Sequence, residues 1–235
     1  MSLPLLFVDE LRGFYKSKVM LFLWVGLPVI AILFRFVQVS TTGQEISFTV
    51  ISTLIVSILA GTLASVMLAV SIINEKNRHV YELFLIRPIK RRNILFSKYL
   101  SVYLCVAIAS LISVLVGIVT DFIIGGTLST AVFNGLGQSL AISLSVIAVA
   151  CAAGVLIGVA SPSVLVGAIL VIYGGYQTSV IPLLPTILNL PDAALFTIAL
   201  AAATAAALLA GAVVLFERKQ FENYFLLDFF HFILL

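Results

Sequence analysis

Ionisable side chains, the groups that carry most enzyme and transport chemistry, are concentrated in one short stretch of this 235-residue chain. Residues 74–98 contain seven of the thirteen lysines and arginines, together with Glu75 and Glu82. Long uncharged runs lie before and after this stretch. We therefore expect it to meet a water-soluble partner, and its basic residues to fix the orientation of the chain in a membrane.

The composition indicates that lipid is the main solvent of the chain. Hydrophobic residues make up 62% and charged residues only 10%, with a mean hydropathy of +1.24, whereas a soluble domain has about 25% charged residues. The basic residues flank apolar runs, as they do beside membrane spans, instead of forming a patch for nucleic acid. We expect membrane lipid as a partner and no nucleic acid.

Groups suited to catalysis are scarce in the apolar runs. Arg35 is the one charged residue within them, and His79 and His231 lie outside them. The sequence contains no HExxH motif and no GxxxxGK[ST] phosphate loop. Cys105 and Cys151 fall inside apolar runs, where we interpret them as small core residues. We therefore predict no catalytic, cofactor-binding or metal-binding residue in the chain.

Six apolar runs are long enough to cross a membrane, which takes about 20 helical residues. We predict a single all-α membrane domain, residues 1–235, with spans at roughly Val19–Val39, Ile46–Ile73, Tyr99–Thr120, Val132–Ala160, Ser163–Ile181 and Ala193–Phe216. The turn between the fourth and fifth spans is placed at Ser161-Pro162-Ser163, because proline ends or kinks a helix.

The distribution of charged residues between the two sides of the membrane predicts the orientation of the chain. With six spans, twelve of the thirteen basic residues fall on one side, and Glu45, Asp121 and Asp192 fall on the other with Arg35 near that end. Because basic residues stay on the cytoplasmic side, both termini are expected in the cytoplasm of a cell-membrane protein. Arg35 should extend its side chain to the outer boundary.

Three further segments are too short or too broken to be ordinary spans. Residues Leu3–Tyr15 predict a short amphipathic helix in the cytoplasmic interface. Residues 182–192 contain three prolines, so that a continuous helix is not expected, and a re-entrant turn and an apolar loop both remain open. Residues 221–235 form an apolar tail, placed either on the inner leaflet or against a cytoplasmic partner.

Small residues favour close packing of helices in two places. Gly154 and Gly158 form a GxxxG pair, and residues 199–212 are nearly all small. Small residues let helix backbones approach one another. Packing within the bundle is the simpler interpretation, and a contact between subunits is the alternative.

The stretch at 74–98 predicts a short amphipathic helix between the second and third spans. Asn74 is suited to cap a helix over Glu75–Ile86, and Pro88 ends it. On charge alone, the simplest interpretation is a basic loop that binds anionic lipid headgroups.

The order of residues in this stretch resembles the first cytoplasmic loop of ABC exporter permeases of the type-two family. The resemblance is carried by Glu75, Glu82-Leu83-Phe84-Leu85, Pro88, Arg91 and Lys98, and the chain departs from the usual pattern at His79, Val80 and Ser97. It implies that two permease halves, identical or paralogous, pair in the membrane. Each would be driven by a separate cytoplasmic ATPase that holds ATP and Mg²⁺, so the chain itself would not be an enzyme. The implied ATPase-docking residues are Glu75, Tyr81, Glu82, Leu83, Phe84, Leu85 and Pro88.

The predicted spans offer aromatic and aliphatic surface, with Arg35 only near one end, which favours an amphiphilic or hydrophobic cargo. Tyr173, Tyr176 and Gln177 in the fifth span are the candidate pathway residues. The alternative function is a non-enzymatic membrane scaffold that recruits a cytoplasmic partner through residues 74–98. An intramembrane enzyme ranks last, since catalytic groups are scarce.

Overall fold

Every regular element is a helix in the part of the chain that the computed structural model describes, namely residues 3–38, 48–78, 91–125, 130–188 and 193–233. In chain order the elements are α1 (Leu3–Tyr15), α2 (Lys18–Gln38), α3 (Phe48–Asn77), α5 (Arg91–Gly125), α6 (Thr130–Ala160), α7 (Val164–Leu170), the π-helical η2 (Val171–Gly175), α8 (Tyr176–Val180), the 3₁₀ turn η3 (Ile181–Leu183), α9 (Leu184–Ile187) and α10 (Ala193–Ile233).

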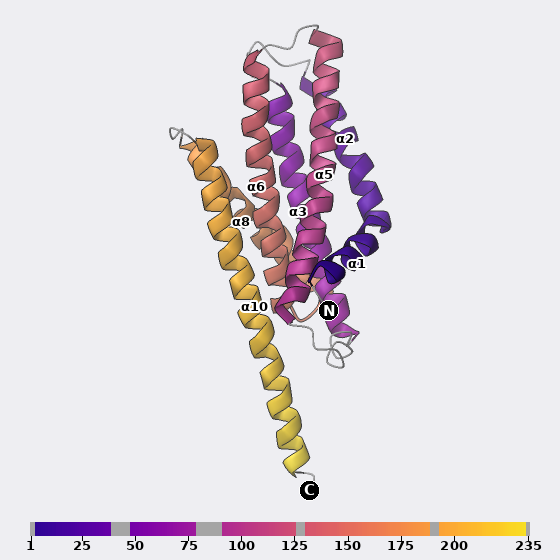
Figure 1. The fold of residues 1–235 in the computed structure, drawn as a ribbon, viewed down its shortest axis with the longest axis vertical. Helices are drawn as coiled ribbons and strands as arrows, with labels where there is room; N and C mark the ends of the chain where they lie inside the picture. The colour runs from indigo at the N-terminus through magenta and orange to yellow at the C-terminus, as the bar shows by residue number, and fades with distance from the viewer. Residues whose placement is uncertain (1–2, 39–47, 79–90, 126–129, 189–192, 234–235) are drawn as a thin grey trace.

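The long helices form a bundle around α3, α5 and α6 (Figure 1). Helix α2 packs beside α5, and α10 packs along α6. The short helix α1 lies across one end of the bundle and is bent by 67° from α2. This geometry agrees with an N-terminal helix that lies along a membrane surface while α2 enters the membrane.

Five helical segments of the described chain are long and apolar enough to cross a membrane. They are Ile55–Asn77, Arg92–Thr120, Gly137–Ala160, Val164–Thr186 and Ala193–Glu217. The bent pair α1 and α2 makes a sixth if it is counted as one span. The prediction of an all-α, multi-pass membrane protein is therefore confirmed.

The helix ends near residues 74–98 differ from the sequence-based expectation. Helix α3 continues through Asn77, and the backbone N–H of Arg78 donates to the Asn74 carbonyl at 3.0 Å. The prediction that Asn74 caps a new helix is therefore wrong, because Asn74 and Glu75 form the last turn of α3. Helix α5 begins at Arg91, two turns before Lys98. Glutamate, lysine and arginine favour helix, so charged ends can extend a span beyond its apolar run.

The turn at residues 161–163 is confirmed. The α-helix is also interrupted at Pro182, by the 3₁₀ turn η3, although the chain stays helical to Ile187. Helix α6 ends at Ala160, and the Ser163 hydroxyl accepts a hydrogen bond from the Val166 N–H at the start of α7. The fifth span then continues through η3 and α9 to Ile187. Pro182 and Pro185 each lie in the first turn of a new helical segment, where an N–H donor is not needed. Residues 189–192 lie outside the described residues.

The glycine pair packs inside one chain. A Cβ atom on Gly154 would lie 2.6 Å from the Cα of Ser65, and one on Gly158 would lie 3.0 Å from the Cα of Ala69. Both neighbours belong to α3, so the backbones of α3 and α6 are in near contact. This agrees with packing within the bundle, the simpler interpretation of the pair. Cys105 and Cys151 are also buried in the core, as expected.

Helix α10 is a single helix of 41 residues, so residues 221–233 continue the sixth span without a break. Figure 1 shows this extension leaving the bundle at the end where α1 lies. The expected location of the tail, on the inner leaflet or against a partner, stays a prediction.

Candidate functional site

Three charged side chains meet where α1, the end of α3 and the start of α5 come together. Lys98 is almost fully buried, with only 2% of its side chain exposed. Its Nζ lies 2.9 Å from Oε1 of Glu10 and 2.5 Å from Oε1 of Glu75. We call Glu10, Glu75 and Lys98 the ion cluster. Through one ammonium group it joins α1 to the end of α3 and the start of α5.

Further contacts complete the surroundings of the lysine. The Ser71 hydroxyl, one turn before Glu75 on α3, donates to Glu75 Oε1 at 3.3 Å. The ring of Phe14 lies with its centroid 5.8 Å from Lys98 Nζ, within the range of a cation–π interaction. An isolated buried ammonium would be costly. Here two carboxylates and an aromatic face offset that cost, so Lys98 is held in place.

The two carboxylates differ from lysine in their exposure. Glu10 and Glu75 keep 23% and 26% of their side chains exposed. Burial raises the pKa of Glu10 above its ordinary value of 4.5, and it outweighs the opposite effect of Lys98. Repulsion from Glu75 and Asp9 also raises this pKa. Glu10 therefore keeps a proton to a higher pH than an ordinary glutamate does.

A cavity of about 500 Å³ lies between α1 and α3, next to the ion cluster. Glu10, Ser17 and Ser71 give it polar groups. The rest of its lining is mainly apolar, from Gly13, Phe14, Val19, Leu63, Val66, Met67 and Val70. Its volume is within the range of about 300–1,000 Å³ that is typical of ligand sites.

The predicted docking residues are only partly placed by the structure. Glu75 lies in the last turn of α3, where its carboxylate contacts Lys98. Tyr81, Glu82, Leu83, Phe84, Leu85 and Pro88 lie outside the described residues. The docking role of all seven residues stays a prediction. In sequence these six residues lie between Arg78 and Arg91, where one described segment ends and the next begins, close to Glu75 and Lys98.

The predicted pathway residues lie together on the fifth span, beside its π-helical part. Tyr173 belongs to η2, and Tyr176 and Gln177 begin α8. All three are exposed on the single chain, Tyr173 by 73%. A π-helical turn within an α-helix is often found at functional positions. Their role in a substrate pathway stays a prediction, and they are separate from the ion cluster.

Sequence reasoning did not place Glu10 in the site. It identified Lys98 as part of a family pattern, and it treated Glu10 only as part of the amphipathic segment Leu3–Tyr15. The available signal was a carboxylate within the short N-terminal helix, but its partner, Lys98, belongs to α5. Among the described residues no group of three or more His, Cys, Asp and Glu side chains is placed to hold a metal ion.

The apolar helices, with the ion cluster at one end of the bundle, define a helical membrane protein that crosses the membrane several times. The family described as "ABC-2 family transporter protein" matches residues 10–178. This match covers more than half of the chain, which therefore belongs to the ABC-2 transporter family. The matched range includes all three members of the ion cluster. The comparisons with curated proteins and with solved structures found no match.

Proposed function

We propose that the chain is the membrane-spanning permease subunit of an ATP-driven exporter. The family match over residues 10–178 is the observation that carries the proposal. Proteins of the ABC-2 membrane family generally work with a cytoplasmic ATPase. The chain itself is then not catalytic, and ATP and Mg²⁺ bind to the partner. Two such permease chains, identical or paralogous, pair in the cell membrane with both termini in the cytoplasm.

The ion cluster supports a route for transmitting ATPase motion into the bundle. The proposed docking loop, within residues 74–98, follows the body of α3 and leads to α5 in the sequence. Because Lys98 joins the end of α3, the start of α5 and α1, a force on the loop moves these three helix ends together. Coupling through a rigid element with two arrangements is the physical requirement for such a mechanism. The fifth span, with Tyr173, Tyr176 and Gln177, then lines the path of an amphiphilic or hydrophobic substrate.

The docking loop is tested with the ATPase that co-purifies with the chain in mild detergent. Glu82→Ala and Leu83→Asp should weaken this complex and abolish the effect of the permease on ATP hydrolysis. Lys16→Ala, a basic exposed position outside the loop, is the matched control and should leave both unchanged. An ATPase that binds and responds equally well to all the variants would overturn the proposed docking site.

The scaffold alternative is separated from the exporter by blocking the pathway. Gln177→Trp adds bulk on an exposed turn of α8, so it should stop substrate movement while the ATPase stays bound. A scaffold would keep its full activity. The orientation has its own test: a membrane-impermeant amine reagent should reach Lys90 and Lys219 from the same side of the bilayer.

A further inference from the structure

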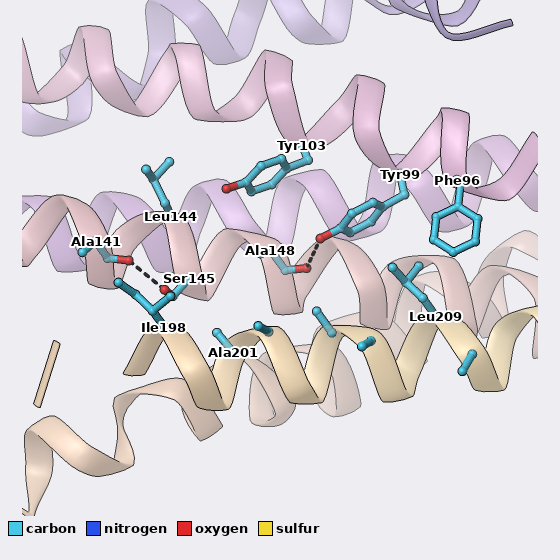
Figure 2. A pocket seen from close by; sticks show the side chains of 14 residues that line it. Phe96, Tyr99, Tyr103, Ala141, Leu144, Ser145, Ala148, Ile198, Ala201 and Leu209 are labelled. Carbon is cyan, nitrogen blue, oxygen red and sulfur yellow. Dashed lines mark hydrogen bonds between the residues drawn. The ribbon is translucent and has the colours of Figure 1, made fainter. Parts of the chain in front are cut away.

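A second cavity, of about 620 Å³, lies between α5, α6 and α10 (Figure 2). Phe96, Tyr99 and Tyr103 form its wall on α5, and five alanines between 201 and 210 form its wall on α10. Helix α6 forms the floor, including Ala141, Ser145 and Ala148. We call this cavity the α10 groove. It has no residue in common with the cavity beside the ion cluster.

The polar atoms of the groove include two hydroxyls that already bond to backbone. The Tyr99 hydroxyl donates to the Ala148 carbonyl at 3.4 Å, and the Ser145 hydroxyl donates to the Ala141 carbonyl at 2.8 Å. The rings of Tyr99 and Tyr103 are nearly parallel, with centroids 6.0 Å apart. The groove therefore offers a flat aromatic wall and aliphatic surfaces, and its lining contains no charged residue. Such a lining suits an apolar ligand.

The groove exists because the side chains of α10 are short. Helix α10 rests on α6 through buried residues spaced by three or four positions, Ala201, Ala205, Leu209, Ala212 and Phe216. The neighbouring Ala202, Ala206 and Ala210 also line the groove but are exposed. An alanine side chain ends at its Cβ, so it leaves the space toward the tyrosines unfilled. An unfilled space of this size loses dispersion contacts on every wall.

The position of the groove within the membrane-spanning helices indicates that lipid surrounds it. All of its lining residues belong to three candidate membrane spans, Arg92–Thr120, Gly137–Ala160 and Ala193–Glu217. The groove therefore opens toward hydrocarbon. From Ile198 to Ala210 it follows α10 for about 18 Å, at 1.5 Å per residue. One leaflet contributes about 15 Å, half of a hydrocarbon core of about 30 Å. The groove thus matches one acyl chain in length.

A basic residue of α5 precedes the aromatic wall of the groove on the same helix face. Arg92, Phe96, Tyr99 and Tyr103 are spaced by four, three and four residues on α5, so they share one face of the helix. Arg92 is exposed and stands one turn beyond Phe96, toward the end of the bundle that holds the ion cluster. A guanidinium at this position can donate two parallel hydrogen bonds to a phosphate.

We propose that the α10 groove binds one acyl chain of an anionic membrane phospholipid, with Arg92 at the phosphate. The lipid comes from the leaflet on the side of the ion cluster. The proposal requires only that the helices span a bilayer, so it is independent of export and of any ATPase.

The test uses nanodiscs that contain a phosphatidylglycerol probe with a diazirine in its acyl chain. After irradiation, adducts should concentrate on residues 96–103 and 198–210. Ala206→Phe fills the groove and should reduce these adducts about tenfold, which corresponds to about 1.4 kcal/mol. Ala207→Phe is the matched control, because Ala207 is exposed beside the groove but does not line it. Ala202→Phe and Ala203→Phe form a second pair in case the first does not fold.

The arginine is tested with a second probe. Arg92→Gln should lower labelling by the phosphatidylglycerol probe toward the level seen with a phosphatidylcholine probe. Equal labelling of the Ala206→Phe and Ala207→Phe proteins would overturn the proposal, since it would indicate ordinary surrounding lipid. Displacement of the phospholipid probe by a fatty acid that carries a diazirine would also overturn the proposal. A disulfide-linked dimer of the Ala206→Cys protein would overturn it as well, because the groove would then be a contact between two copies of the chain.

Discussion

Helix α6 packs most extensively against α3 and α10, and the two contacts differ in kind. Toward α3, Gly154 and Gly158 bring the backbones into near contact. Toward α10, alanines support the helix on α6 but leave a groove of about 620 Å³ beside α5. Small residues therefore have two effects in the same bundle. Glycine facing a backbone closes an interface, and alanine facing large aromatic side chains leaves it open.

The closed side of the molecule also contains the ion cluster. Glu10, Glu75 and Lys98 join α1, α3 and α5, and the described residues of α10 contribute no member to this cluster. The comparison indicates a firmly connected group of helices, α1, α3, α5 and α6, with α10 attached along one edge. The following experiments test this difference, from the largest expected effect to the smallest.

The largest effect is expected from Lys98→Met. Removing the ammonium leaves Glu10 and Glu75 partly buried and without their counter-charge, and loss of one partner from a buried ion pair costs about 3 kcal/mol or more. Since both carboxylates keep some exposure, we expect about 3 kcal/mol. The free energy of unfolding in mixed micelles measures this loss. Adding Glu10→Gln and Glu75→Gln should restore much of it, and an unchanged single variant would show that the cluster does not hold the closed side together.

Gly154→Ala should be the next most damaging change. The new Cβ atom would lie 2.6 Å from backbone atoms of Ser65, so α3 and α6 must move apart. Overpacking of this kind costs about 1–3 kcal/mol. The same unfolding measurement applies, together with the thermal midpoint in detergent. A fully stable variant would mean that the two helices adjust freely, contrary to a closed interface.

The pH dependence of stability should show a smaller effect confined to the ion cluster. The pKa of Glu10 is raised in the folded protein, so the folded state keeps its proton to higher pH than the unfolded state. The contribution of Glu10 is therefore complete below pH 4.5, the ordinary value, and is lost as the pH rises through the raised pKa. Unfolding free energies across this range should decrease with pH, and Glu10→Gln should remove that decrease. A slope that persists in Glu10→Gln would assign it to another group.

The smallest effect is expected for Gly211→Ala on the open side. A Cβ atom there would lie 3.6 Å from Leu156 Cδ1, an ordinary contact. Alanine favours helix over glycine by about 1 kcal/mol at most. The variant should therefore be as stable as the native protein or slightly more stable. Destabilisation as large as that of Gly154→Ala would remove the distinction between the two sides of α6.

The sequence predicted the helical membrane fold, because apolar runs and charge depletion are local properties. It also predicted the turn at Ser161–Ser163 and the buried cysteines. It did not predict the continuation of α3 through Glu75 or of the fifth span past Pro182. In both cases neighbouring helices supply the packing that the local pattern lacks, and each proline stands where a new helical segment begins.

The site was harder to predict than the fold. The lysine was noticed through its place in a family pattern, but its pairing with Glu10 depends on how α1 lies across the bundle. The α10 groove could not be inferred either. Residues 199–212 indicated close approach of helices, and only the position of Tyr99 and Tyr103 opposite them shows where a space is left.

Helix α10, on the open side of the bundle, extends well beyond its candidate membrane span. After Glu217, the last residue of its candidate span, the helix continues to Ile233, about 24 Å farther at 1.5 Å per residue. Because α10 is one continuous helix, any tilt of its membrane-spanning part would carry this extension with it. A small tilt of the spanning part would then give a larger displacement at the far end of the helix, near Ile233.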